Sequence, residues 1–373
     1  KSPYGLSFRG TVGAVYGALR SGAAEDPRYS GAAAVQVMQA IDDTLALMPE
    51  PVEAVTVKGK PNPTVMVIGG TGFIGRNLTR TLVARGYDVR VLSRGKYGPF
   101  ADIADHVETV SVSLKDDEGL RHAMDGIDAV FNLAKSMDKT WDAALENDVG
   151  VAIRVAEAAL DAGVKRLIYT GTIASYDMSD SAVTITEDTD FGDMEERNLY
   201  ARSKAECEKQ LMRMHDEKGL PVVIARLFNT VGPRQTGQYG MVIPRFVERA
   251  LQNKPIQIYG DGQQTRCFSC VHDVTDALMR LMDCADADGR VFNIGSDEEI
   301  TIEGLADKII ALSGSSSQKE FLSYEQAYGR PFDDMMRRVP GLRRIHSAIG
   351  FEPLQRRPGA HVFRHHREGS GRR

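Results

Sequence analysis

The stretch Val65-Met66-Val67-Ile68-Gly69-Gly70-Thr71-Gly72-Phe73-Ile74-Gly75 decides the fold, because four apolar residues lead into glycines spaced three apart. A short apolar run, a Gly-rich turn and an amphipathic segment are typical of a strand, a tight turn and a helix. The first glycine permits the turn, the second lets the backbone approach a pyrophosphate, and the third lets helix and strand pack closely. The helix N-terminus adds free N–H groups and partial positive charge. We therefore expect a dinucleotide to be bound by Gly69, Gly72, Phe73, Ile74 and Gly75.

The same alternation of apolar runs and amphipathic segments continues toward the C-terminus. Repeated strand–helix–strand units favour a parallel sheet covered by helices on both faces, so the expected fold class is α/β, a Rossmann-type doubly wound parallel sheet. The expected strands are 65–68, 88–92, 128–133, 166–170 and 222–225, and the expected helices are 73–85, 141–162 and 200–215.

Length and composition limit the possible classes of protein. A chain of 373 residues predicts two domains with some surplus, at about 150 residues each. With 42% hydrophobic and 26% charged residues, the composition is that of a globular protein. A net charge of −5 argues against a nucleic-acid partner, and no stretch approaches the roughly 18 apolar residues that span a membrane. Four cysteines in so long a chain form no disulfide framework, so we expect a cytoplasmic protein.

Two segments of different composition flank the alternating region. Residues 1–62 are expected to form an N-terminal helical extension or the remnant of a preceding domain, because part of 17–43 resembles the C-terminal end of Gfo/Idh/MocA-type oxidoreductases. The chain opens on Lys1 rather than Met, which favours a chain cut from something longer. Residues 354–373 contain six arginines and one acid without apolar periodicity, and we expect a basic, disordered tail.

The residues at the end of the second expected strand bear on the choice of cofactor. A site for NAD carries Asp or Glu roughly 20 residues after the last glycine, on the ribose hydroxyl. This chain has Ser93 and Arg94 there, and a guanidinium beside a hydroxyl suits a 2′-phosphate. The cofactor is therefore NADP or NAD, with NADP slightly favoured; the alternative is that Arg94 is an ordinary surface arginine.

A Tyr-x-x-x-Lys pair supplies the candidate chemistry. Tyr200 and Lys204 lie four residues apart on an expected helix and so share one face. A nearby ammonium favours tyrosinate, so we expect Lys204 to lower the pKa of Tyr200, which then exchanges the proton of a sugar hydroxyl. Thr172, at the carboxyl end of a strand, is placed to hydrogen-bond the same oxygen.

Taken together, these motifs resemble the extended short-chain dehydrogenase/reductases, in the NAD-dependent epimerase/dehydratase group. The resemblance covers residues 64–353 and rests on several motifs in order. Beyond the glycine loop and the Thr-Tyr-Lys set, they are Arg226 to Arg234 (R-x-x-N-x-Y-G-P-like), Tyr259 to Arg266 (Y-G-D-G-x-x-x-R-like), Val271 to Val274, and Phe292 to Gly295.

The resemblance implies a domain organisation and a substrate. Residues 63–234 would form the dinucleotide-binding domain, and 235–353 mainly a smaller C-terminal α/β substrate domain with segments returning to the Rossmann core. The substrate would be a nucleotide-sugar, with Asn229 and Arg266 on its diphosphate and Tyr259 near the nucleotide.

The resemblance also implies further contacts of the cofactor and an oligomeric state. Ala134, Tyr200 and Lys204 would contact the cofactor, and Lys204 would grip the nicotinamide ribose. A homodimer would form through the helices 141–162 and 200–216.

Departures from the family pattern narrow the reaction. Dehydratases and UDP-glucuronate decarboxylases carry an acid two residues after the catalytic Thr, where this chain has Ala174. Lys135 stands where a small residue usually follows, near the cofactor or turned to solvent. We therefore expect an NAD(P)-dependent nucleotide-sugar epimerase. The alternatives are an NADPH-dependent keto-sugar reductase, a UDP-glucuronate decarboxylase-like enzyme and a non-catalytic cofactor-binding scaffold.

The Cys267-x-x-Cys270 pair has no second pair to complete a closed zinc site. We expect buried free thiols there and no metal.

Overall fold

The computed structural model describes residues 61–93, 98–176, 184–193, 198–235, 241–328 and 336–353, and the structural statements below concern these residues. The basic segment 354–373 and all but the last two residues of 1–62 lie outside this part of the chain, as does Arg94. No helix of the described part is long and apolar enough to cross a bilayer.

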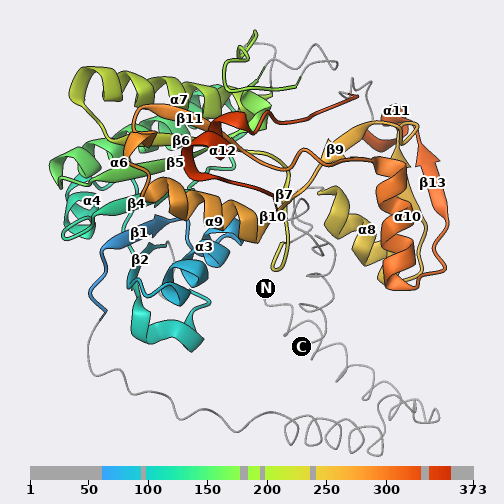
Figure 1. The fold of residues 1–373 in the computed structure, drawn as a ribbon, viewed down its shortest axis with the longest axis horizontal. Helices are drawn as coiled ribbons and strands as arrows, with labels where there is room; N and C mark the ends of the chain where they lie inside the picture. Colours follow the sequence, from blue (N-terminus) through green and yellow to red (C-terminus); the bar gives the residue numbers. More distant parts are fainter. Residues whose placement is uncertain are drawn as a thin grey trace, which may run out of the picture. The chain divides into compact units, whose positions relative to one another are not determined.

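A sheet of seven parallel strands forms the centre of the fold (Figure 1), in the order β11-β6-β5-β4-β1-β2-β3. The order reverses between β1 and β4, and ligands bind beyond the carboxyl ends of strands at such a switch point. The expected doubly wound parallel sheet is thus confirmed. Its strands are β1 (Val65–Ile68), β2 (Val89–Leu92), β3 (Val107–Val110), β4 (Ala129–Asn132), β5 (Arg166–Thr172), β6 (Val222–Leu227) and β11 (Arg290–Ile294).

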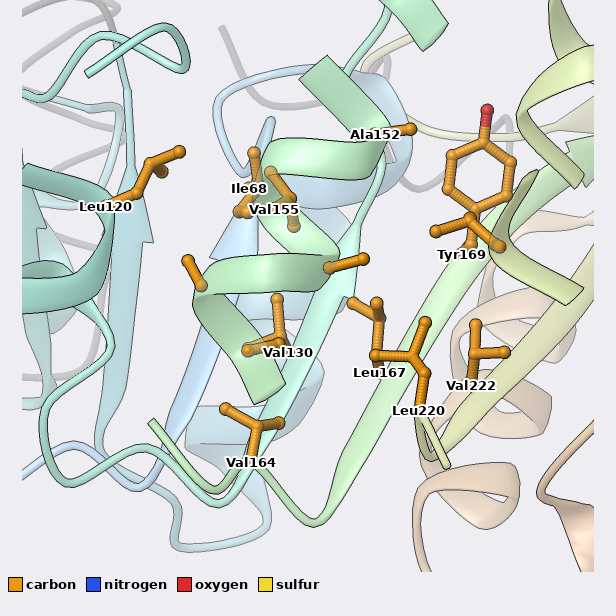
Figure 2. Close-up of a cluster of buried hydrophobic side chains, with 14 of the residues drawn as sticks. Ile68, Leu120, Val130, Ala152, Val155, Val164, Leu167, Tyr169, Leu220 and Val222 are labelled. Atoms are coloured by element: carbon orange, nitrogen blue, oxygen red, sulfur yellow. The ribbon is translucent and has the colours of Figure 1, made fainter. Parts of the chain in front are cut away.

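Helices cover both faces of this sheet, which explains why its strands are apolar without alternation. Met66 and Ile68 pack on one face, and Val65 and Val67 on the other. Figure 2 shows the first cluster, in which Val155 lies on the helix that covers the strands. The first face is covered by α4 (Asp117–Ala123), α6 (Gly150–Asp161) and α7 (Leu199–Lys218), and the second by α3 (Phe73–Ala84), α9 (Val271–Met282) and α12 (Arg343–Ile349).

A smaller group of elements has a core of its own, around Phe246, Ile258 and Leu305. The prediction of a domain boundary at residue 234 stays a prediction. The group contains α8 (Val242–Leu251), α10 (Ile302–Ser313) and the parallel pair β8 (Ile256–Tyr259) and β13 (Lys319–Leu322), followed by α11 (Tyr324–Tyr328). Two further pairs are β7 (Thr230–Val231) with β10 (Ser269–Cys270) and β9 (Thr265–Cys267) with β12 (Glu299–Thr301).

The segment 141–162 is not the uniform α-helix that its length predicts. α5 (Trp141–Ala144) continues into a π-helical turn, η3 (Leu145–Val149), before α6 begins. A π turn bonds each residue to the fifth one along, and such turns are frequent at functional sites. Asp148 lies in this turn and accepts a hydrogen bond from the backbone N–H of Ser136, in the loop after β4, at 2.7 Å.

Candidate active site

A cleft lies at the carboxyl ends of β1, β4 and β5, and consists of two adjoining hollows of about 710 and 720 Å³. Gly69, Leu133, Lys135 and Tyr200 line both hollows. Among the predicted site residues, the first hollow contains Gly69, Gly72, Phe73, Ile74, Gly75, Thr172, Tyr200, Lys204, Asn229, Tyr259 and Arg266, and the second contains Gly69, Gly72, Ser93, Ala134 and Tyr200.

The glycine loop has no room for side chains at the positions where the sequence has none. Gly69 adopts a φ of +80°, a conformation that glycine reaches without strain. A Cβ on Gly75 would lie 2.3 Å from the carbonyl oxygen of Gly69, so a larger residue would push loop and helix apart. Gly72 caps α3, whose first turn contains no acidic residue. The helix N-terminus therefore keeps its partial positive charge and fits a diphosphate.

Two arginines that the sequence reading did not single out lie beside this loop. Arg76, in the first turns of α3, donates to the backbone carbonyl of Thr71 at 3.1 Å. Arg234 donates to the Oδ1 of Asn77 at 3.2 Å. Burial lowers the pKa of Arg76, and the positive charge of Arg234 lowers it further. The two guanidiniums are therefore close enough to repel each other. Their charge adds to that of the helix end and favours a phosphate group.

The catalytic candidates come together from α7 and the end of β5. Asn198 caps α7 by accepting a hydrogen bond from the backbone N–H of Ala201 at 3.0 Å, which fixes the helix start one residue before Tyr200. The Thr172 side chain lies near the Tyr200 hydroxyl and lowers its pKa, against the rise that burial causes. Thr172 Oγ1 also accepts from the backbone N–H of Ala174 at 3.2 Å. A substrate hydroxyl placed between the two side chains would meet both.

The expected effect of Lys204 on the pKa of Tyr200 stays a prediction. The Lys204 ammonium donates to the carbonyl of Thr170 at 2.8 Å and lies 4.5 Å from the ring centroid of Tyr169. Lys204 is buried, which lowers its pKa; Tyr200 is 37% exposed as a residue, but the surroundings of its hydroxyl are desolvated, which raises the pKa of Tyr200. The sequence shows the shared helix face, but the desolvation of both groups depends on tertiary packing.

A buried ion pair supports the catalytic face of α7, and the sequence reading missed it. Glu208 lies one helical turn beyond Lys204, and its Oε2 accepts a hydrogen bond from Arg226 Nε at 2.8 Å. Both residues are nearly inaccessible, and burial raises the pKa of Glu208 while Arg226 opposes the rise. A Cβ on Gly171 would lie 2.2 Å from Glu208 Oε1, so the glycine lets β5 pass over the pair. The four-residue spacing Tyr200–Lys204–Glu208 was the available signal.

Two further charged residues, Lys135 and Asp148, lie near Tyr200. Lys135, in the loop after β4, places its Nζ 4.2 Å from the ring centroid of Tyr200. The residue is exposed, and partial burial of its ammonium lowers its pKa while Asp148 and Asp138 oppose the change. Lys135 thus combines the two fates expected for it, because it lines the cleft and also faces solvent. Asp148 is half-buried and raises the pKa of Tyr200.

The residues expected to bind substrate line the end of the cleft beside the smaller group of elements. Asn229 Nδ2 donates to the carbonyl of Cys267 at 2.9 Å. The guanidinium of Arg245 lies 4.0 Å from the ring centroid of Tyr259, a stacked cation and ring that the motif did not reveal. Arg266 is buried and donates to the carbonyl of Thr265 at 2.7 Å. Cationic and aromatic groups thus meet where a nucleoside diphosphate is expected.

The Cys267-x-x-Cys270 pair lies beneath this region as two buried free thiols, as expected. Burial raises the pKa of Cys267 to about 12, so its thiol stays protonated.

The fold and the cleft together define the class of the protein. A tyrosine able to exchange a proton stands in one cleft with a dinucleotide-binding glycine loop, in the arrangement of an extended short-chain dehydrogenase/reductase. More particularly, the chain belongs to the NAD-dependent epimerase/dehydratase family, whose model matches residues 65–295, more than half of its length.

Curated relatives within this family act on nucleotide-linked sugars. The chain is 32% identical over 299 residues to a UDP-N-acetyl-alpha-D-glucosaminuronate decarboxylase of Bacillus cytotoxicus, with 77% of this chain and 92% of the relative covered. It is 29% identical to UDP-glucuronic acid decarboxylase 4 of Arabidopsis thaliana, with 78% and 65% covered. The decarboxylase alternative, against which Ala174 argues, is thus the activity named for both relatives.

Solved structures share the fold. The epimerase Mth375 of Methanothermobacter thermautotrophicus superposes with a TM-score of 0.70 at 26% identity, covering 83% of this chain and 93% of that one. DesIV, a dTDP-glucose 4,6-dehydratase of Streptomyces venezuelae solved with NAD and TYD bound, gives 0.67 at 25% identity, covering 82% and 98%. The chain is therefore an enzyme of the NAD-dependent epimerase/dehydratase family.

Proposed function

We propose that the protein is an NAD(P)-dependent nucleotide-sugar epimerase that oxidises the sugar at C4 and reduces it again from the other face. The observation that supports this best is the side-chain set around Tyr200: a Thr172 hydroxyl within hydrogen-bonding reach and Ala174 in place of an acid. Such a site can exchange the hydroxyl proton but holds no second acid at position 174 to eliminate water.

Each side chain has a separate task in this proposal. Tyr200 takes the C4 hydroxyl proton and returns it, and Thr172 orients the oxygen. Lys204 is held on the carbonyl of Thr170, beneath the catalytic face. A bound NAD(P) would supply the reversible exchange of a hydride with C4. The glycine loop, Arg76 and Arg234 would hold the diphosphate of the cofactor, while Ser93 and Arg94 would favour NADP.

The second candidate is a decarboxylase of UDP-hexuronic acids, which the names of the relatives favour. Both reactions begin with oxidation at C4, because a 4-keto hexuronic acid is a β-keto acid that can lose its carboxylate as CO2. They differ in the product, which has six carbons after epimerisation and five after decarboxylation.

One experiment separates the candidates. UDP-glucuronic acid and UDP-glucose are incubated with the full chain and NAD or NADP, and the sugar products are identified by NMR. An epimerase yields a six-carbon epimer of at least one of them without net change in cofactor absorbance. A pentose with CO2 would assign the decarboxylase. In a parallel incubation of a UDP-4-keto-sugar with NADPH, net loss of NADPH absorbance would assign the reductase. Cofactor binding without any turnover would support the scaffold.

Two further features are proposals of the same kind. Replacement of Arg94 by Asp should lower NADP affinity selectively, as measured by fluorescence titration. A homodimer through α5, η3, α6 and α7 should give twice the chain mass in sedimentation; a monomer would overturn it.

A further inference from the structure

We propose that Lys135 binds the carboxylate of the sugar, so that the enzyme takes nucleotide-linked hexuronic acids in preference to neutral hexoses. This inference rests on the proposed function and adds a substrate class to it.

The position of Lys135 is the first argument. Its ammonium lies over the ring of Tyr200, 4.2 Å from the centroid, and the residue lines both hollows of the cleft. Tyr200 marks the place of the reacting C4 hydroxyl. In a hexuronic acid the carboxylate is carried by the neighbouring ring carbon, so it lies only a few ångströms from that hydroxyl. A cation beside Tyr200 is therefore within reach of it.

The second argument is the bonding of the ammonium. Lys135 is exposed, and a lysine ammonium carries three N–H donors. Among the described residues, the face of the Tyr200 ring and the charges of Asp148 and Asp138 act on it, and none of them accepts a hydrogen bond from it. The donors can therefore pair with an anionic group that enters the cleft, and charge-assisted hydrogen bonds of this kind are among the strong ones.

The third argument is the sign of the local charge. Lys204 adds a second ammonium beside Tyr200, and its own pKa is lowered by the charge of Lys135. The nearby Glu208 is paired with Arg226, and position 174 is Ala instead of an acid. Asp148 offsets part of the positive charge. The reacting end of the cleft thus favours an anionic sugar over a neutral one.

The diphosphate of the cofactor is the other anion that could meet Lys135. The glycine loop, the N-terminus of α3, Arg76 and Arg234 already surround the place of that diphosphate. Lys135 instead lies on the catalytic tyrosine. The sugar carboxylate is therefore the better match.

The test compares the affinities of UDP-glucuronic acid and UDP-glucose by titration calorimetry with NAD present. Wild type should prefer the uronic acid. Lys135→Met, which keeps the aliphatic stem, should lower this preference about 10- to 100-fold, because hydrogen bonds to charged groups are among the strong ones. Lys135→Arg should retain most of it. Lys115→Met removes an exposed lysine that pairs with Glu146 and should leave the preference unchanged.

Other outcomes overturn the proposal in distinguishable ways. If Lys135→Met weakens NAD binding while the sugar preference stays constant, the residue serves the cofactor. If wild type binds both sugars equally, Lys135 does not select uronic acids, although epimerisation of UDP-glucose would leave the proposed function intact. If neither sugar binds, both proposals fall. Circular dichroism of each variant checks that the fold is retained.

Discussion

The floor and the rim of the cleft are built on opposite principles. The floor, which comprises the glycine loop 69–75, Thr172 and the α7 face from Tyr200 to Glu208, holds buried charges that are paired with partners far away in the chain. The rim is formed by Lys135, whose ammonium is exposed, and by Asp148, whose carboxylate is half-buried. The floor carries the motifs of the whole family, whereas Lys135 departs from them. We infer that the floor sets the chemistry and the rim sets the substrate.

Among the substitutions in the floor, Tyr200→Phe should have the largest effect on turnover. It removes the proton-exchanging hydroxyl and keeps the ring on which Lys135 lies. Turnover should fall about 10³- to 10⁴-fold, because general acid–base groups contribute up to this factor. NAD affinity should change little. Steady-state kinetics and a cofactor titration measure the two effects, and a variant with a tenth of wild-type activity would contradict the role of Tyr200.

The second substitution in the floor removes Arg226, the ion-pair partner of Glu208. Arg226→Leu leaves a carboxylate that is 2% exposed without its ion pair, which should lower the free energy of unfolding by about 3–5 kcal/mol. The matched control, Arg154→Leu, breaks an exposed pair with Asp117 and should cost about 1 kcal/mol or less. Chemical denaturation measures both.

The double variant Glu208→Leu/Arg226→Leu should recover much of the lost stability, because no unpaired charge remains. If Arg226→Leu and Arg154→Leu lowered the free energy of unfolding equally, the buried pair would stabilise the fold no more than a surface pair does.

Gly75→Ala should have a smaller effect on stability and on NAD binding. The added methyl group would meet the Gly69 carbonyl at 2.3 Å, and overpacking of this kind typically costs about 1–3 kcal/mol. We expect a lower melting temperature and NAD affinity reduced about tenfold or more. Gly150→Ala is the control, since its new methyl group would lie 3.4 Å from the Leu145 carbonyl in an ordinary helical conformation. Unchanged NAD affinity in Gly75→Ala would show that the loop tolerates a side chain.

The floor was largely predictable from sequence because its signals are local. The apolar run before Gly69 and the helical stripe after Gly75 predict strand, turn and helix from neighbouring residues alone. The four-residue spacing of Tyr200 and Lys204 places them on one helix face. Parallel strands end at one edge of a sheet, which explains why Thr172 meets them.

The other features of the site depend on contacts between residues that are distant in the chain. No sequence pattern shows that Lys135 lies on the Tyr200 ring, or that Glu208 pairs with Arg226. The rise in the pKa of Tyr200 follows first from desolvation of its hydroxyl, which depends on tertiary packing. The π turn around Asp148 involves a change in hydrogen-bond partners that leaves the apolar spacing almost unaltered.

The smallest predicted effect is that of the rim residue Asp148 on the pKa of Tyr200. Asp148 raises the pKa of Tyr200, because a carboxylate disfavours the tyrosinate. Asp148→Asn removes the charge and keeps an oxygen that can accept the hydrogen bond from the Ser136 N–H. The pKa of Tyr200 should therefore fall. Since sugar oxidation requires the tyrosinate, activity should persist to lower pH than in wild type.

The measurement is kcat against pH in the direction of sugar oxidation. Glu146→Gln neutralises another carboxylate of the same π turn, one that is exposed and paired with Lys115, and should leave the acid limb in place. An acid limb that moves in Glu146→Gln as far as in Asp148→Asn would indicate a general loss of negative charge instead of a local one. A shift confined to Asp148→Asn would show that the rim tunes the acid–base group of the floor while it selects the substrate, so that the two regions are coupled through the face of one tyrosine ring.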